Sequence, residues 1–521
     1  MFVVGARGAA ARDAAAIGAG IPARALMQRA GAAAAGEIAR SYRRRLRRGA
    51  AVAVFTGAGN NGGDAWVVAR ALSAAGISVR VHEAGEPRSH DTAKERELAR
   101  ACLPEHAVDG SEAIVVDGLL GTGASGRPRG AVAAAIERIA LLRASGAAIV
   151  SLDLPSGLDA TSGECDESVE ADLTIAFGAP TRGLLLSRDR CGRIVVVDIG
   201  LGRYAVLDDG AAVLVDPAMA RAVVAPIGAT AHKAVRGKLV IVGGARGMLG
   251  AVVLAGRAAM RSGIGMVRLV VPEESVAAAQ AALPEALAAP WPESADGEAV
   301  DRQVSSWADV VLLGPGMGAS AETRSLAERI LTDWRGPVVL DADALNVFAG
   351  GMEPLARLID GRVALITPHV AELARLASCS VASVNERRFE IGSEIAAVLG
   401  AAVLLKGVPT VISPPRRGRT WVSATGTPAL AQAGSGDVLS GIAATLMAHT
   451  GDAARSGSCA AWVHGRAAEL AGRVRPVRGI ALDDIIAALG DAWAIPLPEF
   501  RYPVLAELPP VNDARGRRND W

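Results

Sequence analysis

The segment QAGSGDVLSG, residues 432–441, places a carboxylate beside a loop suited to binding an anion. Gly434, Ser435 and Gly436 allow consecutive backbone N–H groups to converge, and the apolar pattern that follows predicts a helix. Because the start of a helix carries partial positive charge, this loop could hold a phosphate group. Asp437 could then act as a general base beside the phosphate, or it could simply cap free N–H groups of the first helical turn.

Oxygen-bearing side chains follow three predicted strands of the N-terminal half. They are Asn61 and Asp64 after AVAVF, Asp117 in AIVVDGLL, and Asp153 with Ser156 after AIVSL. The carboxyl ends of parallel strands form the edge where open α/β sheets bind ligands, and hard oxygen donors favour a hard cation. The acidic residues of LDLPSGLDATSG could instead serve only to form a turn around its proline and glycine.

The loop TGAGNNGGDAWVVAR, residues 56–70, also matches the GxGxxG spacing of dinucleotide-binding folds, with Glu83 near the end of the next strand. This signal is weak because GTGASG matches the same spacing and the chain contains 60 glycines. In addition, the carboxylate of Asp64 would repel a pyrophosphate placed on the start of the following helix.

Further loops that could bind phosphate end predicted strands in the C-terminal half. No GxxxxGK[ST] motif occurs, so a P-loop enzyme is excluded. Glycine loops lie at residues 242–263 and 312–318, TPHVAEL contains His369 and Glu372, and LLKGVPTVI contains Lys406 and Thr410. Each of these features alone is compatible with an ordinary strand-to-helix turn, whereas together with the 432–441 loop they favour a nucleotide site.

The elements that carry these residues alternate between short β-branched runs and alanine-rich helical stretches. Such runs predict parallel strands buried on both faces, so the expected fold class is α/β. One series of strands ends near residue 205, and a second begins with KLVIVGG at residue 238. We place the boundary near residue 210, giving domains 1–210 and 211–495 and an extended or disordered tail over 496–521.

Composition excludes several function classes. With 55 basic and 54 acidic residues, the chain has almost no net charge that could attract nucleic acid or an anionic membrane. Its five cysteines lack CxxC spacing, which argues against a disulfide framework or a zinc site. No signal peptide and no long uncharged apolar run is evident, so we expect a cytoplasmic protein that does not bind membranes.

Four segments of the first half resemble, in order, the motifs of the NAD(P)H-hydrate epimerase domain, also called the YjeF N-terminal domain. They are GAGNNGGDAWVVAR, VVDGLLGTGASGRPRG, SLDLPSGLDATSG and TIAFGAPTRGLLL. The resemblance covers about residues 10–205 and implies a Rossmann-like three-layer α/β/α domain and a potassium ion held by Asn61, Asp117 and Ser156. Epimerising C6 of the hydrated ring requires proton transfer, and Asp153 is the carboxylate that we expect to perform it. The substrate contacts it implies are Asn60, Asn61, Gly62, Gly63, Asp64, Gly121, Thr122, Gly123, Ala124, Ser125, Gly126, Arg127 and Asp153.

The second half resembles ADP-dependent NAD(P)H-hydrate dehydratase of the ribokinase-like superfamily, over about residues 215–492. The motifs are HKAVRGKLVIVGGARGMLGAVVLAGRAAMRSG, GPGMG, VVLDADALN, TPHVAEL, LLKGVPTVI and AGSGDVLSGI. The resemblance implies a ribokinase-like three-layer α/β/α domain in which Asp437 is the catalytic base. The hydrate contacts it implies are Ala251, Gly316, His369 and Asp437, and the nucleotide contacts are Lys406, Gly407, Val408, Pro409, Thr410 and Gly436.

These resemblances together imply a fused enzyme that repairs hydrated NADH and NADPH. We expect the first domain to interconvert the R and S hydrates, and the second to dehydrate the S hydrate with ADP as co-substrate and magnesium on the nucleotide. The expected partners are therefore small molecules, and the chain is expected to form a homo-oligomer. The alternative is a ribokinase-like small-molecule or vitamin kinase whose N-terminal domain is a non-catalytic binding module.

Overall fold

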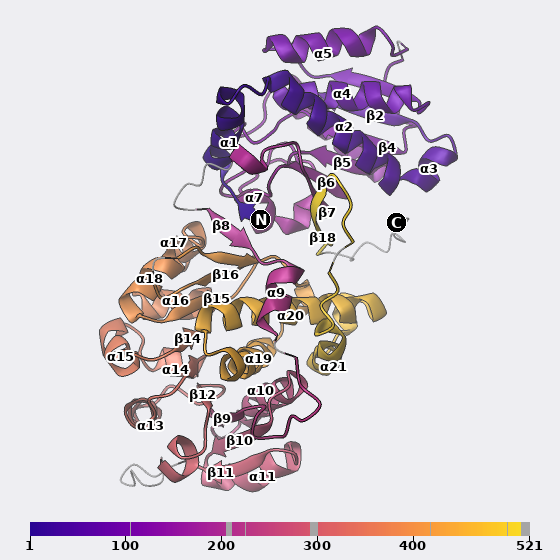
Figure 1. Ribbon diagram of the computed structural model, residues 1–521. Coiled ribbons are helices and arrows are strands. Elements are labelled where there is room, and N and C mark those ends of the chain that lie inside the picture. The colour runs from indigo at the N-terminus through magenta and orange to yellow at the C-terminus, as the bar shows by residue number, and fades with distance from the viewer. Residues whose placement is uncertain are drawn as a thin grey trace. The chain divides into compact units, whose positions relative to one another are not determined.

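The computed structural model describes residues 1–104, 106–204, 211–224, 226–291, 301–416, 418–497 and 499–511. The chain divides into two compact units (Figure 1). The N-terminal unit contains Phe2–Ala211 and the segment from Glu499 onward, and the C-terminal unit contains Ala212–Pro498. Among the residues the structure describes, no helix combines the length and the apolar character needed to cross a membrane.

A mostly parallel sheet forms the centre of the N-terminal unit. Its strands are β2 (Val52–Thr56), β3 (Val79–Glu83), β4 (Ile114–Gly118), β5 (Ala148–Leu152), β6 (Leu173–Phe177), β7 (Arg193–Val197) and β18 (Val504–Leu508), in the spatial order β18-β7-β6-β5-β4-β2-β3. The strands from β2 to β7 pair in parallel. After β3 the chain returns to the other side of β2, so the topological switch point lies between β2 and β4, where open α/β sheets bind their ligands.

Helices cover both faces of this sheet. They are α1 (Ala6–Gly18), α2 (Ala23–Ser41), α3 (Arg43–Arg47), α4 (Asn60–Ala74), α5 (His90–Arg100), α6 (Ala131–Ala144), α7 (Arg182–Leu186) and α8 (Arg188–Cys191). Val52 and Val54 of β2 pack in one core with α2 and α4, whereas Ala53 and Phe55 pack in a second core with α6. Because alternate strand residues point to opposite faces, the continuous apolar runs are explained by burial on both sides.

The C-terminal tail supplies a strand that the sequence pattern did not assign to a sheet. Strand β18 pairs antiparallel with β7, and Arg193 of β7 binds Glu507 at 2.6 Å and Glu37 of α2 at 3.1 Å. Arg501 also binds Glu37, at 2.8 Å. The proline-rich composition does not predict these ion pairs. Residues 512–521 of the predicted tail lie outside the described part of the chain.

Glycines allow a close approach of the backbone to itself within the β2–α4 turn. A Cβ added to Gly62 would lie 1.8 Å from the carbonyl oxygen of Gly57. We therefore expect Gly62→Ala to lower the free energy of unfolding of the N-terminal unit by about 1–3 kcal/mol through overpacking, measured as a shift in the denaturation midpoint. Gly59→Ala is the matched control, because nothing lies within 4 Å of its added Cβ. Equal shifts for the two variants would contradict this interpretation.

The C-terminal unit has its own sheet, in the order β8-β17-β16-β15-β14-β13-β12-β9-β10-β11. The strands are β8 (Ala212–Leu214), β9 (Lys238–Val242), β10 (Met266–Val271), β11 (Leu287–Pro290), β12 (Val310–Leu313), β13 (Val338–Leu340), β14 (Ala364–Ile366), β15 (Ala402–Leu405), β16 (Thr410–Ser413) and β17 (Trp421–Ser423). Strand β16 is antiparallel to both of its neighbours. The chain switches sides between β9 and β12, which marks a second ligand-binding edge.

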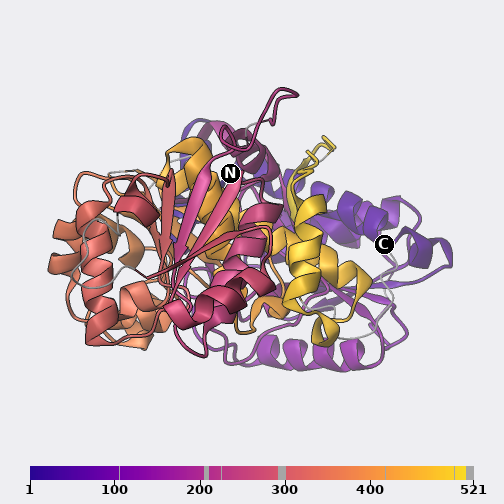
Figure 2. The same cartoon turned by 90° about the horizontal axis from the view of Figure 1, so that it is seen from below.

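Two helical layers enclose this second sheet (Figure 2). Leu239 and Ile241 of β9 pack with α10 (Leu249–Arg261), α19 (Ser435–Thr450), α20 (Ala453–Val474) and α21 (Leu482–Ala492). Val240 and Val242 pack on the opposite side with α13 (Ala321–Asp333), α15 (Met352–Ile359), α16 (Val370–Leu376) and α18 (Ile391–Leu399). The other α-helices in the described part of this unit are α9 (Pro217–Val223), α11 (Val276–Ala282), α14 (Asp343–Asn346) and α17 (Val381–Glu386). The predicted α/β class is thus confirmed for both units.

Candidate active sites

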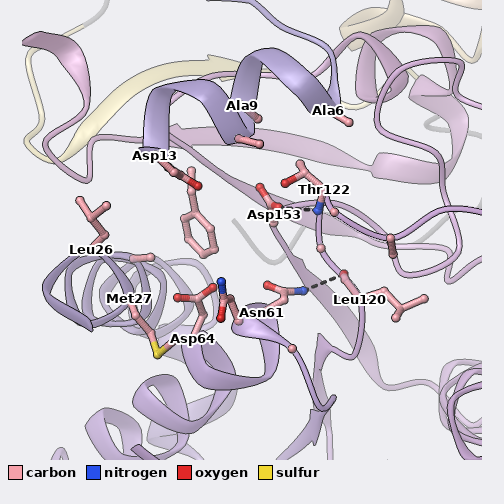
Figure 3. A pocket seen from close by; sticks show the side chains of 18 of the residues that line it. Ala6, Ala9, Asp13, Leu26, Met27, Asn61, Asp64, Leu120, Thr122 and Asp153 are labelled. Atoms are coloured by element: carbon pink, nitrogen blue, oxygen red, sulfur yellow. Dashed lines mark hydrogen bonds between the residues drawn. The ribbon is translucent and has the colours of Figure 1, made fainter. Parts of the chain in front are cut away.

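A cavity of about 520 Å³ lies at the switch point of the N-terminal unit. Its walls come from the start of α4, the loop after β4, the end of β5 and the helices α1 and α2 (Figure 3). Of the predicted substrate contacts, those lining it are Asn60, Asn61, Asp64, Gly121, Thr122, Gly123, Ala124 and Asp153. Gly62, Gly63, Ser125, Gly126 and Arg127 are not among its lining residues, and Arg127 instead pairs with Glu167.

Hydrogen bonds fix the side-chain amide of Asn61 beside the cavity through its nitrogen but not through its oxygen. Its nitrogen donates to the carbonyl oxygens of Leu120, at 2.8 Å, and Leu152, at 3.1 Å. Its Oδ1 atom is buried without a hydrogen-bond partner among the described residues. A buried acceptor without a donor is costly, so this oxygen is suited to a cation or to a donor from a ligand.

Asp117 and Ser156, the other predicted potassium ligands, are joined to each other. The Ser156 hydroxyl and backbone N–H donate to the carboxylate of Asp117 at 2.5 and 2.9 Å, and the hydroxyl of Ser151 donates at 2.9 Å. Burial raises the pKa of Asp117, while these donors oppose the rise. The pair therefore ties β4 to the loop after β5, and of the three predicted ligands Asn61 carries the unsatisfied oxygen.

Asp153 faces the cavity from a strained turn after β5. Its backbone has a φ of 65°, an unusual value for a residue other than glycine, and strain of this kind is often found at functional sites. One carboxylate oxygen accepts a hydrogen bond from the backbone N–H of Thr122 at 3.0 Å. Burial raises the pKa of Asp153, and the donors at Thr122 partly oppose it. This carboxyl group is thus held in place and poised to exchange a proton.

Two more carboxyl groups share the cavity with Asp153. Burial, followed by the charges of Asp153 and Asp13, raises the pKa of Asp64 well above its usual range. Asp13, on α1, was not predicted from the sequence; burial and Asp153 raise its pKa to about 6, although the neighbouring Arg12 opposes the rise. Carboxyl groups that repel one another hold protons near neutral pH, which suits acid–base chemistry.

In the C-terminal unit, the two predicted glycine loops meet at the second switch point. The N–H groups of Gly244 and Ala245 donate to the carbonyl oxygens of Pro315 and Gly316 at 2.9 and 2.7 Å. Gly316 has a φ of 56°, and a Cβ added to it would lie 3.0 Å from the Cβ of Ala251. The predicted hydrate contacts Ala251 and Gly316 are therefore direct neighbours.

Asp437 lies in the first turn of α19, which begins at Ser435. Gly434 precedes it with a φ of 90°, and the structure records no side-chain cap at this helix start. No hydrogen bond to the Asp437 carboxylate appears in the described part of the chain, so the capping interpretation is not supported. Burial and the nearby charge of Asp341 raise the pKa of Asp437 to about 7, while Lys406 opposes the rise.

Lys406 connects the remaining polar groups of this site. Its ammonium lies 2.8 Å from Asp341 and 3.6 Å from Glu372. Burial lowers its pKa, but the charges of Asp341 and Glu372 outweigh burial and raise it overall. Glu372 also accepts from the backbone N–H of His369 at 2.8 Å, which fixes the start of α16. Burial lowers the pKa of the His369 imidazole and favours its neutral form.

The side chain of Lys406 reaches the glycine loop of α19. A Cβ added to Gly436 would lie 3.2 Å from the ammonium nitrogen of Lys406, so these two predicted nucleotide contacts are adjacent. Gly407 has a φ of 139°, and its carbonyl oxygen accepts from the hydroxyl of Thr410 at 3.0 Å. Val408 is exposed and is followed by Pro409, whose carbonyl oxygen accepts from Arg388 at 3.1 Å.

Sequence reasoning missed the acidic residues Asp13, Asp341 and Asp343. Asp341 and Asp343 follow β13 directly, so their place at the carboxyl end of a parallel strand could have signalled the site. Asp343 accepts from the backbone N–H of Gly318 at 2.7 Å and so holds the second glycine loop. No comparable signal marks Asp13, because it lies within a helix that carries no other acidic residue.

Comparison with known proteins gives consistent matches. A family model described as NAD(P)H-hydrate dehydratase matches residues 239–490, and one described as YjeF-related protein N-terminus matches residues 23–183. A bifunctional NAD(P)H-hydrate repair enzyme of Moorella thermoacetica is 33% identical, over 89% of this chain and 91% of its own length. One of Escherichia coli is 34% identical, over 84% of each chain. The crystal structure of an ADP/ATP-dependent NAD(P)H-hydrate dehydratase of Bacillus subtilis is 28% identical, with a TM-score of 0.49, over 54% of this chain and 98% of its own.

Proposed function

The chain belongs to the family of bifunctional NAD(P)H-hydrate repair enzymes, and from this premise we propose which residues carry its two reactions. We assign interconversion of the R and S hydrates to residues 1–210 and nucleotide-dependent dehydration of the S hydrate to residues 211–495. The segment 496–521 is assigned neither reaction. A small-molecule or vitamin kinase is not favoured, because the relatives matching most of the chain are named as hydrate repair enzymes.

Dehydration needs a better leaving group than hydroxide. Transfer of the terminal phosphoryl group of ADP to the hydroxyl on C6 of the hydrated ring gives AMP and a phosphate ester. The lone pair of the ring nitrogen then expels phosphate, and loss of a proton from C5 restores the dihydropyridine. In this scheme Asp437 takes the proton of the hydroxyl, and the N–H groups of Gly434 to Gly436 stabilise charge on the moving phosphoryl group.

The environment of Asp437 is the single observation that carries this assignment. Its carboxylate has a raised pKa, lies in the first turn of α19 and interacts electrostatically with Lys406, yet the described residues give it no hydrogen bond. Such a group is available to a substrate hydroxyl. Lys406, beside Gly436, is suited to the charge of the nucleotide phosphates.

The described residues contain no group of three or more His, Cys, Asp or Glu side chains suited to a metal ion. The residues of this site therefore fit magnesium only as an ion carried on the nucleotide, where phosphate oxygens supply hard ligands. A bound magnesium ion would screen the charge of those phosphates. We propose ADP as the co-substrate, with Lys406, Gly407, Val408, Pro409, Thr410 and Gly436 as its contacts.

The N-terminal cavity is proposed to bind the hydrated nicotinamide ring beside Asp153. Protonation of the C6 hydroxyl lets the ring nitrogen expel water, and addition of water to the other face of the ring inverts C6. The unsatisfied Oδ1 of Asn61 supports a potassium ion at this edge, and Asp117 with Ser156 would border the ion. Potassium would supply positive charge near the substrate when bound.

The pH dependence of dehydration follows from the raised pKa of Asp437. Below pH 7 the carboxyl group is increasingly protonated and cannot accept the hydroxyl proton. We expect kcat/KM for the S hydrate with ADP to fall about tenfold per pH unit below 7 and to level off above it, since kcat/KM reports groups of the free enzyme. The measurement is initial rates at low hydrate concentration; a flat profile down to about pH 5 would contradict an acid–base role for this pKa.

One assay tests the whole proposal. A mixture of R and S hydrates is incubated with the protein and ADP, and regenerated NADH is followed by absorbance. Complete and rapid conversion is expected; conversion that stalls after the S fraction would refute the epimerase assignment, and the absence of conversion would refute the dehydratase. The homo-oligomeric state and the cytoplasmic location remain predictions, and light scattering tests the former.

A further inference from the structure

Asp13 is a carboxyl group of the N-terminal cavity that the reaction scheme has not yet used. It projects from α1, whereas Asp153 reaches the same cavity from the turn after β5 (Figure 3). Asp13 lines the cavity, and none of the described residues forms a hydrogen bond with its carboxylate. A side chain that lines a cavity without contributing to the hydrogen bonding of the fold is free to contact a ligand.

The surroundings of Asp13 bring the pKa of its carboxyl group close to neutral pH. The charged side chains lining the cavity with Asp13 are Arg12, Asp64, Arg88, Asp91 and Asp153. Burial and the charge of Asp153 raise the pKa of Asp13 to about 6, and Arg12 opposes the rise. Near neutral pH the cavity thus contains carboxyl groups that both hold and accept protons.

We propose that Asp13 is the second acid–base residue of the epimerisation, acting on the face of the hydrated ring opposite to Asp153. The inference rests on the proposed function of the N-terminal unit. A single carboxyl group can serve one face of a flat ring, and inversion at C6 requires water to leave from one face and add to the other. Asp13 on α1 and Asp153 after β5 reach the cavity from different elements, and we assign one face of the ring to each.

The protons balance over one inversion. One carboxylic acid protonates the C6 hydroxyl, the C6–O bond breaks with its electron pair on the departing water, and the ring nitrogen lone pair forms the iminium. A second water adds to C6 from the opposite face and gives its proton to the carboxylate there. The two residues end with their protonation states exchanged, which is the state needed for the reverse inversion.

The test is oxygen exchange with H₂¹⁸O on the separate R and S hydrates without nucleotide. With one carboxyl group removed, the other still expels and re-adds water on its own face. In Asp13→Asn we therefore expect inversion to fall at least about 100-fold while enzyme-dependent ¹⁸O incorporation persists for one epimer only. In Asp153→Asn, exchange should persist for the other epimer.

Equal loss of exchange for both epimers in Asp13→Asn would indicate a structural role and overturn the proposal, as would unchanged inversion. Asp189→Asn, an exposed carboxylate outside the cavity, is the matched control and should behave as the unmodified chain. Should Asp13→Asn fail to fold, Asp13→Ser takes the same test. Inversion by the unmodified chain is measured in parallel, and its absence would refute the epimerase assignment itself rather than the role of Asp13.

Discussion

Asp437→Asn is expected to lower the rate of nucleotide-dependent dehydration about 100- to 10,000-fold, the range typical of a lost general base. The amide cannot take the hydroxyl proton, yet it has nearly the shape of the carboxylate. Because several acidic side chains, including Asp341 and Asp343, repel Asp437, removing its charge should not destabilise the fold. The measurement is NADH formation from the purified S hydrate with ADP.

Two comparisons make this result specific. Interconversion of the R and S hydrates by the same variant should be unchanged, since it belongs to the other unit. Asp360→Asn, which removes an exposed carboxylate at the end of α15, should leave dehydration unchanged. Asparagine is as good a helix cap as aspartate, so an Asp437→Asn variant with normal dehydration would restore the capping role and remove the proposed base.

The strand ends of both units were predictable because their apolar runs are buried on two faces and stand out in the sequence. Runs of the first half end at the sheet edge where Asn61, Asp117 and Asp153 lie. Runs of the second half end where Lys406 lies near Asp437. Four of the predicted strands illustrate this: β9, β12, β13 and β14 lie side by side in parallel. The family resemblance read from the motifs at these strand ends is confirmed by the relatives.

The features that could not be predicted from the sequence depend on contacts between distant segments. The antiparallel strand β18 forms on β7 through residues some 300 positions away in the chain, as the Arg193–Glu507 pair illustrates. Asp13 lies in an alanine-rich helix, and its importance becomes visible only when α1 closes one wall of the cavity. Likewise, Asp117 and Ser156 bind each other, and the buried oxygen without a partner is that of Asn61; this is a property of geometry and not of spacing.

Asp153→Asn is expected to slow interconversion of the R and S hydrates by about 100- to 10,000-fold. The variant keeps an oxygen that can accept from the N–H of Thr122, so the loop after β4 should remain in position. Its amide cannot protonate the departing hydroxyl or receive a proton from the incoming water. In the coupled assay with ADP, NADH formation should stop once the S fraction is consumed, apart from slow spontaneous epimerisation.

The stalled assay separates the two reactions within one chain. Adding the unmodified protein to the stalled mixture should convert the remaining R hydrate. Adding the Asp437→Asn variant, which supplies only the epimerase, should have the same result. Because each variant lacks a different reaction, the mixture of the two should regain complete conversion. If Asp153→Asn alone converts both hydrates at the normal rate, Asp153 is not the acid–base residue, and its strained backbone at a φ of 65° would have to be explained by the hydrogen bond to Thr122 alone.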